Sequence, residues 1–154
     1  MDNNDILRRL RFIFDFNDAK LISIFALADH RISRTEITSL LKKEDDPTRQ
    51  KCSDTLLATF LNGLIIDKRG RKEGVQPAPE KHLTNNTIFM KLKIAEDLKA
   101  EDVLALMERA GFPMSKHELS ALFRKPDNKH YRECKDQILR NFLKGMQLKY
   151  RPKK

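Results

Sequence analysis

An internal repeat is the feature of this sequence that most constrains its fold. When the chain is compared with itself at an offset of 82 positions, residues 3–64 align with residues 85–146 without a gap, and 17 of the 62 pairs are identical. Polar pairs such as Asn4/Asn86 and Asp15/Asp97 are matched as well as apolar ones. Chance does not produce this agreement, so the sequence predicts a duplicated structural unit of about 62 residues.

Each repeat has the apolar spacing of four amphipathic helices. In the first repeat the pattern predicts helices near residues 4–15, 18–29, 34–43 and 53–67, and the second repeat carries counterparts 82 positions later. Strand patterns are essentially absent, which favours an all-α fold. Asn4 and Asn86 are predicted to cap the first helix of each repeat.

The third helix of each repeat has the firmest predicted start. Ser33 with Glu36, and Ser115 with Glu118, follow the S-x-x-E pattern of a capping box just before an apolar stripe. In the fourth helix, Phe60 and Phe142 are predicted to lie in the core. Glycine is a poor helix former, so Gly63 and Gly145 inside the same stripe indicate a close helix crossing.

Residues 68–84 contain two glycines, two prolines and several basic residues, and predict an exposed linker. The chain therefore divides into a first helical repeat (3–67), this basic linker (68–84) and a second helical repeat (85–150). A unit of about 60 residues buries only about 60% of its unfolded surface. We therefore expect the two repeats to pack together as a pseudo-two-fold pair.

Side chains that could support catalysis lack the spacing that catalysis requires. The four histidines match no metal-ligand spacing, and there is no glycine-rich phosphate loop or activated serine motif. Cys52 and Cys134 are interpreted as small buried residues near the start of the fourth helix. Asp15 and Asp97, at the end of the first helix, have no explanation beyond a tertiary hydrogen bond or salt bridge. We expect no enzyme activity, catalytic residue, metal or cofactor.

Charge is distributed unevenly along the chain. The formal net charge is +9, of which residues 1–80 contribute +1 and residues 81–154 contribute +8. Positive charge on one part of a protein favours nucleic acid or another acidic partner. The candidate contacts are the basic residues of the last loop and last helix of the second repeat: Arg124, Lys125, Lys129, Arg132, Lys135, Arg140 and Lys144.

The charge of the last helix is specific to the second repeat. The first repeat has Thr55, Ala58, Thr59 and Asn62 where the second has Gln137, Arg140, Asn141 and Lys144. Lys149, Arg151, Lys153 and Lys154 extend the basic region to the end of the chain. Two helices followed by the basic, glycine-containing stretch 67–72 also loosely resemble a winged helix-turn-helix, although the loop between the two helices is longer than that motif uses.

The compartment is predicted from what the sequence lacks. No apolar stretch approaches the 18 to 20 residues, roughly, that a membrane span needs, and the first residues are polar. Two cysteines without a C-x-x-C pattern fit a reducing environment. These features predict a cytoplasmic protein that does not enter the membrane.

Two segments resemble a known family. Residues 59–70 read TFLNGLIIDKRG and residues 126–145 read PDNKHYRECKDQILRNFLKG. With the paired Asn-Asn starts of the repeats, they are similar to the YehS family of small bacterial proteins, a domain of unknown function, over residues 3–148. The resemblance implies a bacterial cytoplasmic protein with this fold, and it supplies no catalytic residues.

Two functions therefore stay open at this point. The first is a non-catalytic protein that binds nucleic acid or another acidic partner through its basic second repeat. The alternative is a protein-interaction or adaptor module in which the charge only maintains solubility. The sequence does not indicate whether the chain forms a homo-oligomer.

Overall fold

The computed structural model describes residues 1–151 and is helical throughout its regular structure. These residues form eight α-helices and no strand, as the sequence predicted. The helices are α1 (Asn3–Ile13), α2 (Asp18–Leu27), α3 (Arg34–Leu41), α4 (Asp54–Arg69), α5 (Asn85–Ala95), α6 (Ala100–Arg109), α7 (Lys116–Leu122) and α8 (Asp136–Tyr150). The chain divides into two compact units at residues 83 and 84, each with four of these helices.

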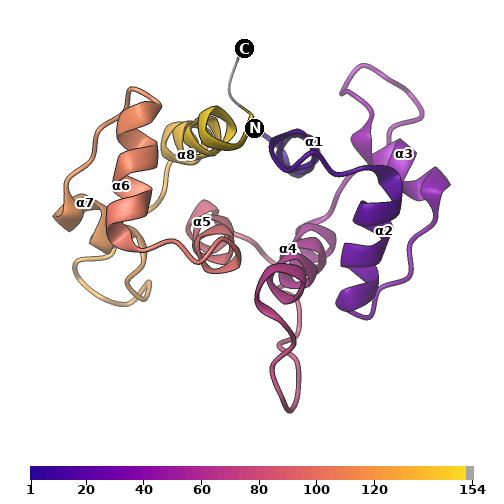
Figure 1. Ribbon diagram of the computed structural model, residues 1–154, viewed down its shortest axis with the longest axis horizontal. Helices are drawn as coiled ribbons and strands as arrows, with labels where there is room; N and C mark the ends of the chain where they lie inside the picture. Colours follow the sequence, from indigo (N-terminus) through magenta and orange to yellow (C-terminus); the bar gives the residue numbers. More distant parts are fainter. Residues whose placement is uncertain (152–154) are drawn as a thin grey trace. The chain divides into compact units, whose positions relative to one another are not determined.

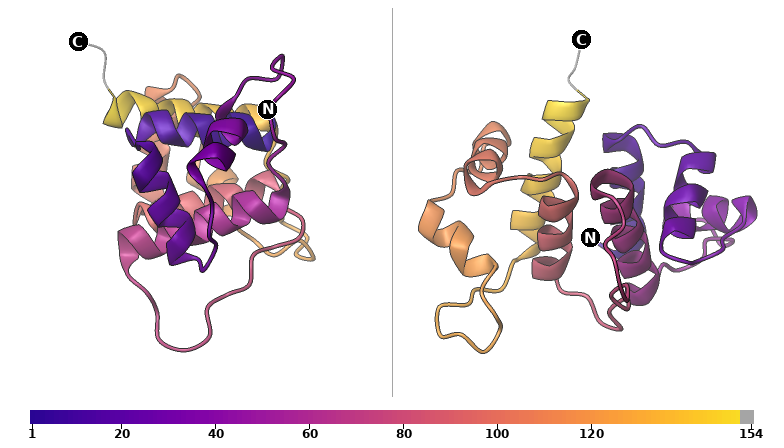
Figure 2. Two further views of the ribbon diagram at one scale, coloured as in Figure 1. Left: turned by 90° about the vertical axis from the view of Figure 1, so that its right-hand side faces the viewer. Right: turned by 60° about the horizontal axis from the view of Figure 1, so that its bottom comes forward.

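The two units repeat one order of helices (Figure 1). In the first unit, α2 packs against α3 and α4, and α1 also contacts both α3 and α4. Figure 2 (left) shows this unit facing the viewer, with α2 and α3 running across α1 and α4. In the second unit α6 packs against α7 and α8, and α5 packs against α8. The predicted four-helix unit and its duplication are confirmed.

The third helix of each unit begins with a capping box, as predicted. Glu36 donates its backbone N–H to Ser33 Oγ at 3.1 Å, and the Glu36 carboxylate accepts the Ser33 N–H at 3.1 Å. Ser115 and Glu118 form the same pair of bonds at 3.0 and 2.9 Å. These bonds satisfy backbone groups that a helix start leaves without intrahelical partners.

The prediction that Asn4 and Asn86 cap the first helices is wrong. Asp2 caps α1 and Thr84 caps α5, each two residues earlier than predicted. Several consecutive polar residues at each start are suitable caps by residue type, so the sequence pattern alone does not select among them. Asn4 and Asn86 lie within the first helical turn and are buried.

Asp15 and Asp97 are explained by backbone conformation. Each follows the C-cap residue of its first helix and has a left-handed backbone, at φ 55° and φ 52°. The N–H of Phe16 donates to the carbonyl of Arg11 at 3.0 Å, and the N–H of Asp15 donates to that of Phe12 at 3.2 Å. This pattern is a Schellman motif, and the second unit repeats it. Aspartate is among the few non-glycine residues that tolerate this conformation.

The phenylalanine of the fourth helix in each unit lies in the core, as predicted. Phe60 and Phe142 are both 0% exposed. Phe60 lies 5.3 Å from Phe25 between ring centroids, and Phe142 stacks on Phe89 at 4.1 Å. Each unit therefore has an aromatic pair at the centre of its core.

The predicted close crossing at Gly63 and Gly145 is also confirmed. A Cβ atom placed on Gly63 would lie 2.0 Å from the carbonyl oxygen of Ile24 in α2. A Cβ atom on Gly145 would lie 2.3 Å from the carbonyl oxygen of Leu106 in α6. Only a residue without a side chain lets these backbones approach so closely.

We expect Gly63→Ala and Gly145→Ala each to destabilise the protein by about 2 kcal/mol. Overpacking costs about 1–3 kcal/mol, and the rigid backbone opposite favours the upper end, while alanine regains roughly 1 kcal/mol of helix propensity. Urea unfolding followed by circular dichroism measures the change. Thr55→Ala on the exposed side of α4 is the control and should be close to neutral. Unchanged stability in both glycine variants would contradict the close crossings.

The last turn of α4 extends further than the sequence predicted. Lys68 and Arg69 were placed in the linker but are helical, and Gly70 ends the helix with a φ of 86°. The chain then leaves the helices of the first unit as a long loop (Figure 1). The end of this loop is attached to the start of α4, because the N–H of Leu83 donates to Asp54 Oδ2 at 2.9 Å.

Candidate nucleic-acid interface

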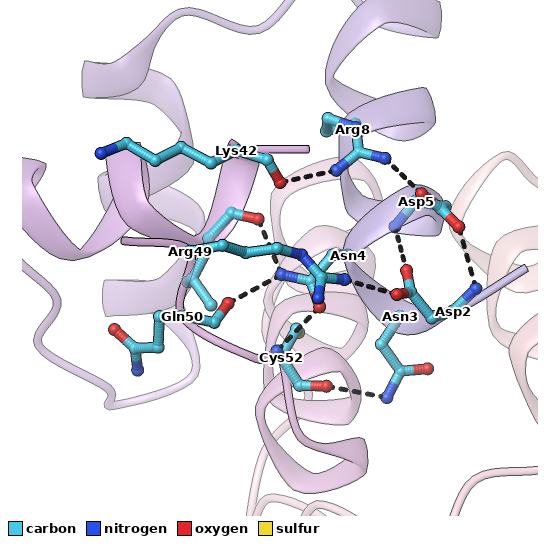
Figure 3. Close-up of polar contacts among 10 residues, drawn as sticks. Asp2, Asn3, Asn4, Asp5, Arg8, Lys42, Arg49, Gln50 and Cys52 are labelled. Carbon is cyan, nitrogen blue, oxygen red and sulfur yellow. Dashed lines mark hydrogen bonds and ion pairs between the residues drawn. The ribbon is translucent and has the colours of Figure 1, made fainter. Parts of the chain in front are cut away.

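Two asparagines hold the loop between α3 and α4 of the first unit in place, and we call this pair the asparagine clamp (Figure 3). The side-chain amide of Asn4 donates to the carbonyls of Leu40 and Gln50 at 2.9 and 2.8 Å, and its oxygen accepts the N–H of Cys52 at 3.0 Å. Asn3 donates to the carbonyl of Cys52 and to Asp54 at 3.1 and 2.7 Å. One helix start thereby fixes both ends of the loop between α3 and α4.

The second unit contains the same clamp. Asn86 donates to the carbonyls of Leu122 and Arg132 at 2.9 and 2.8 Å and accepts the N–H of Cys134 at 2.8 Å. Asn85 donates to Cys134 and Asp136 at 3.0 and 2.7 Å, and its donation lowers the pKa of the Asp136 carboxyl. The paired asparagines at the start of both repeats therefore have a structural role.

The interior of the two loops also shares one backbone design. Asp46 accepts the N–H of Thr48 at 2.8 Å, and Asn128 accepts the N–H of His130 at 2.8 Å, which closes an Asx turn in each loop. The N–H of Arg132 donates to the carbonyl of Ala121 at 3.1 Å, as Gln50 does to Ser39. The fold therefore provides the same loop twice.

The chemistry of the two loops differs strongly. Residues 42–50 carry three basic and three acidic side chains, whereas residues 124–132 carry four basic and one acidic. Every basic side chain of the second loop is exposed, namely Arg124, Lys125, Lys129 and Arg132. Because the loop backbone forms equally well without this charge, the charge is not a requirement of the fold.

Helix α8 places two further predicted residues at the surface. Arg140 and Lys144 are exposed and lie four residues apart, which puts them on one helix face. Their equivalents in α4 are Ala58 and Asn62, which are 0% and 8% exposed. At these two helix positions the second unit therefore has exposed basic residues, whereas the first unit has buried uncharged ones.

Lys135 lies at the N-terminal edge of the last helix. It is the N-cap residue of α8, without a side-chain capping bond, and does not share the helix face of Arg140 and Lys144. Its ammonium pairs with the carboxylate of Glu133 at 3.0 Å, and both side chains are largely exposed. Lys135 thus belongs with the loop, and part of its charge is offset locally. Lys149 and Arg151 follow in and after the last turn, whereas Lys153 and Lys154 lie outside the described residues.

The candidate list drawn from the sequence missed two aromatic residues within the basic loop. His130 is exposed and Tyr131 is half-buried, and both lie between Lys129 and Arg132. Their equivalents in the first unit are Thr48 and Arg49. Aromatic residues interleaved with cations were the signal that could have identified them.

Other reactive groups are explained by burial. Cys52 and Cys134 are each 2% exposed, and burial raises the pKa of both thiols to about 12. Both thiols therefore stay protonated and unreactive near neutral pH. Across residues 1–151 no three His, Cys, Asp or Glu side chains gather in a way that would hold a metal. In the same range no helix has both the length and the apolar character needed to cross a bilayer.

Comparison with known proteins supports the duplication. A family model described as "Protein of unknown function (DUF1456)" matches residues 3–70 and, separately, residues 85–151. The uncharacterized protein YehS of Escherichia coli (strain K12) is 43% identical over 156 residues, which covers 100% of this chain and 99% of that protein. No solved structure matches the chain.

Proposed function

The chain belongs to this family of proteins of unknown function, and we propose that it binds nucleic acid through the basic surface of its second unit. We define this surface as the seven residues Arg124, Lys125, Lys129, Arg132, Lys135, Arg140 and Lys144. The observation that carries the proposal is the contrast between two loops of one backbone design, of which only the second is strongly basic.

The side chains of this surface are better suited to contact phosphates than to recognise base edges in the grooves of a duplex. Arg140 and Lys144 on α8 and the four cations of the loop are long, exposed side chains that can reach phosphates. Lysine and arginine at phosphates release bound counterions, so the affinity should fall steeply with salt. Binding through this surface should therefore be tolerant of sequence.

The protein-interaction alternative is favoured by a different observation. Met90 and Ile94 lie four residues apart on α5 and are 38% and 45% exposed, and Phe12 at the position equivalent to Ile94 is 49% exposed. Exposed apolar side chains on one helix face are typical of a surface that recognises protein. This function takes first place if nucleic acid is not retained at low salt.

We expect the double substitution Arg140→Glu and Lys144→Glu to weaken binding to all nucleic-acid sequences about equally. It should also flatten the slope of log affinity against log salt by roughly 2, because each lost phosphate contact removes about 1. Fluorescence anisotropy of labelled oligonucleotides at several salt concentrations measures both quantities.

The matched control is Arg31→Glu with Arg34→Glu. Both residues are exposed in the first unit, and the pair changes the net charge by the same amount. The control should bind nearly as the unsubstituted protein does. If the two double variants behave alike, the second unit has no special role and net charge alone explains the binding.

A further inference from the structure

The basic loop of the second unit combines cations with aromatic rings in a short span. Four basic side chains lie between residues 124 and 132, and His130 and Tyr131 are placed among them. The turn at Asn128 and the bond from the Arg132 N–H to Ala121 hold the backbone on either side of the two rings. The rings therefore lie on an ordered turn.

We propose that residues 124–132 bind a single-stranded polynucleotide, with Tyr131 and His130 stacking on unpaired bases while the basic side chains contact phosphates. This inference rests on the proposed function and specifies its ligand. Stacking on aromatic rings is the common way in which proteins hold single strands without reading sequence. In a duplex the flat faces of the bases are covered by their neighbours, so these rings gain nothing there.

The first unit indicates that the rings are not needed to build the loop. It has Thr48 and Arg49 at the positions of His130 and Tyr131, and the same turn forms there. Arg49 pairs with Asp2 in the first unit, whereas the residue equivalent to Asp2 is Thr84. The second loop thus has an aromatic residue where the first loop has a member of an ion pair.

The test compares one sequence as a single strand and as a duplex, with RNA and DNA arms, on the full-length chain. We expect the single strand to bind at least tenfold more tightly than the duplex at equal salt. Tyr131→Phe should keep this affinity, since the ring is retained. Tyr131→Leu keeps the apolar volume without the ring and should lose about tenfold.

Tyrosine fluorescence gives a readout that a purely structural role would not move. The chain has no tryptophan and two tyrosines, so Tyr150→Phe leaves Tyr131 as the single tyrosine. A base stacked on Tyr131 should quench its emission as the single strand is added, and the duplex should not. The RNA and DNA arms show which sugar is accepted.

The outcomes separate this inference from the function on which it rests. Equal affinity for duplex and single strand, with unchanged Tyr131 emission and no loss in Tyr131→Leu, would overturn the single-strand inference and leave nucleic-acid binding standing. Equal losses in Tyr131→Phe and Tyr131→Leu would overturn the stacking role as well. Failure to bind either form at low salt would overturn both proposals.

Discussion

Replacing Phe60 or Phe142 with alanine is expected to destabilise the protein by about 3–5 kcal/mol, the usual cost of removing a buried phenylalanine ring. Both rings are 0% exposed and pack against a second phenylalanine, Phe25 or Phe89. The substitution removes the apolar burial and leaves a cavity that rigid helices fill only in part. Urea or thermal unfolding followed by circular dichroism measures the loss.

An exposed apolar residue provides the control for this prediction. Ile94 on α5 is 45% exposed, and Ile94→Ala should change the free energy of unfolding by less than about 1 kcal/mol. Losses of similar size in Phe60→Ala, Phe142→Ala and Ile94→Ala would contradict the assignment of the aromatic pairs to the core.

Replacing Asn4 or Asn86 with alanine is expected to cost about 3–5 kcal/mol, although neither residue contributes apolar burial. Each amide makes three hydrogen bonds to backbone groups in or beside the loop before the fourth helix of its unit, at 2.8 to 3.0 Å. A buried backbone group left without its partner costs about 1–3 kcal/mol. Alanine cannot replace any of these bonds, so the clamp should be as sensitive as the core.

Two comparisons identify the cause of this loss. Asn86→Asp keeps the oxygen that accepts the Cys134 N–H but loses both donations, so it should also be strongly destabilising. Asn17→Ala loses one exposed capping bond to the Lys20 N–H and should cost only about 1 kcal/mol. If Asn4→Ala and Asn86→Ala cost no more than Asn17→Ala, the clamp does not hold the loops.

The helices were predictable because they depend on local patterns. Apolar spacing located all eight, and the capping boxes at Ser33 and Ser115 fixed two starts. The glycines at 63 and 145 stood out because they weaken a helix, which required a compensating approach of another backbone. The apolar spacing and the capping boxes act within a few residues, and the glycines mark where a crossing occurs without identifying the helix that crosses.

The clamp and the helix ends were not predictable, because they depend on hydrogen bonds that no local pattern reveals. The partners of Asn4 lie 36 to 48 residues away, and no local pattern distinguishes a clamp from a cap. The left-handed conformation of Asp15 and Asp97 depends on the bonds that close the helix, which residue type alone does not reveal.

The charge of the candidate site was predictable from the sequence, but the turns of its loop were not. The seven basic residues were found by composition, and the described structure places all of them at the surface. We propose His130 and Tyr131 as contacts because the two loops have the same turns, and that equivalence separates residues needed for folding from residues available for binding.

The salt dependence of binding by the unsubstituted full-length protein is the decisive test of nucleic-acid binding through the basic second unit. We predict retention of a labelled single-stranded oligonucleotide at low salt, with log affinity falling against log salt at a slope of roughly −3 to −5, as expected for several cations at phosphates of a single strand. Absence of binding at low salt, or an affinity that does not change with salt, would contradict it.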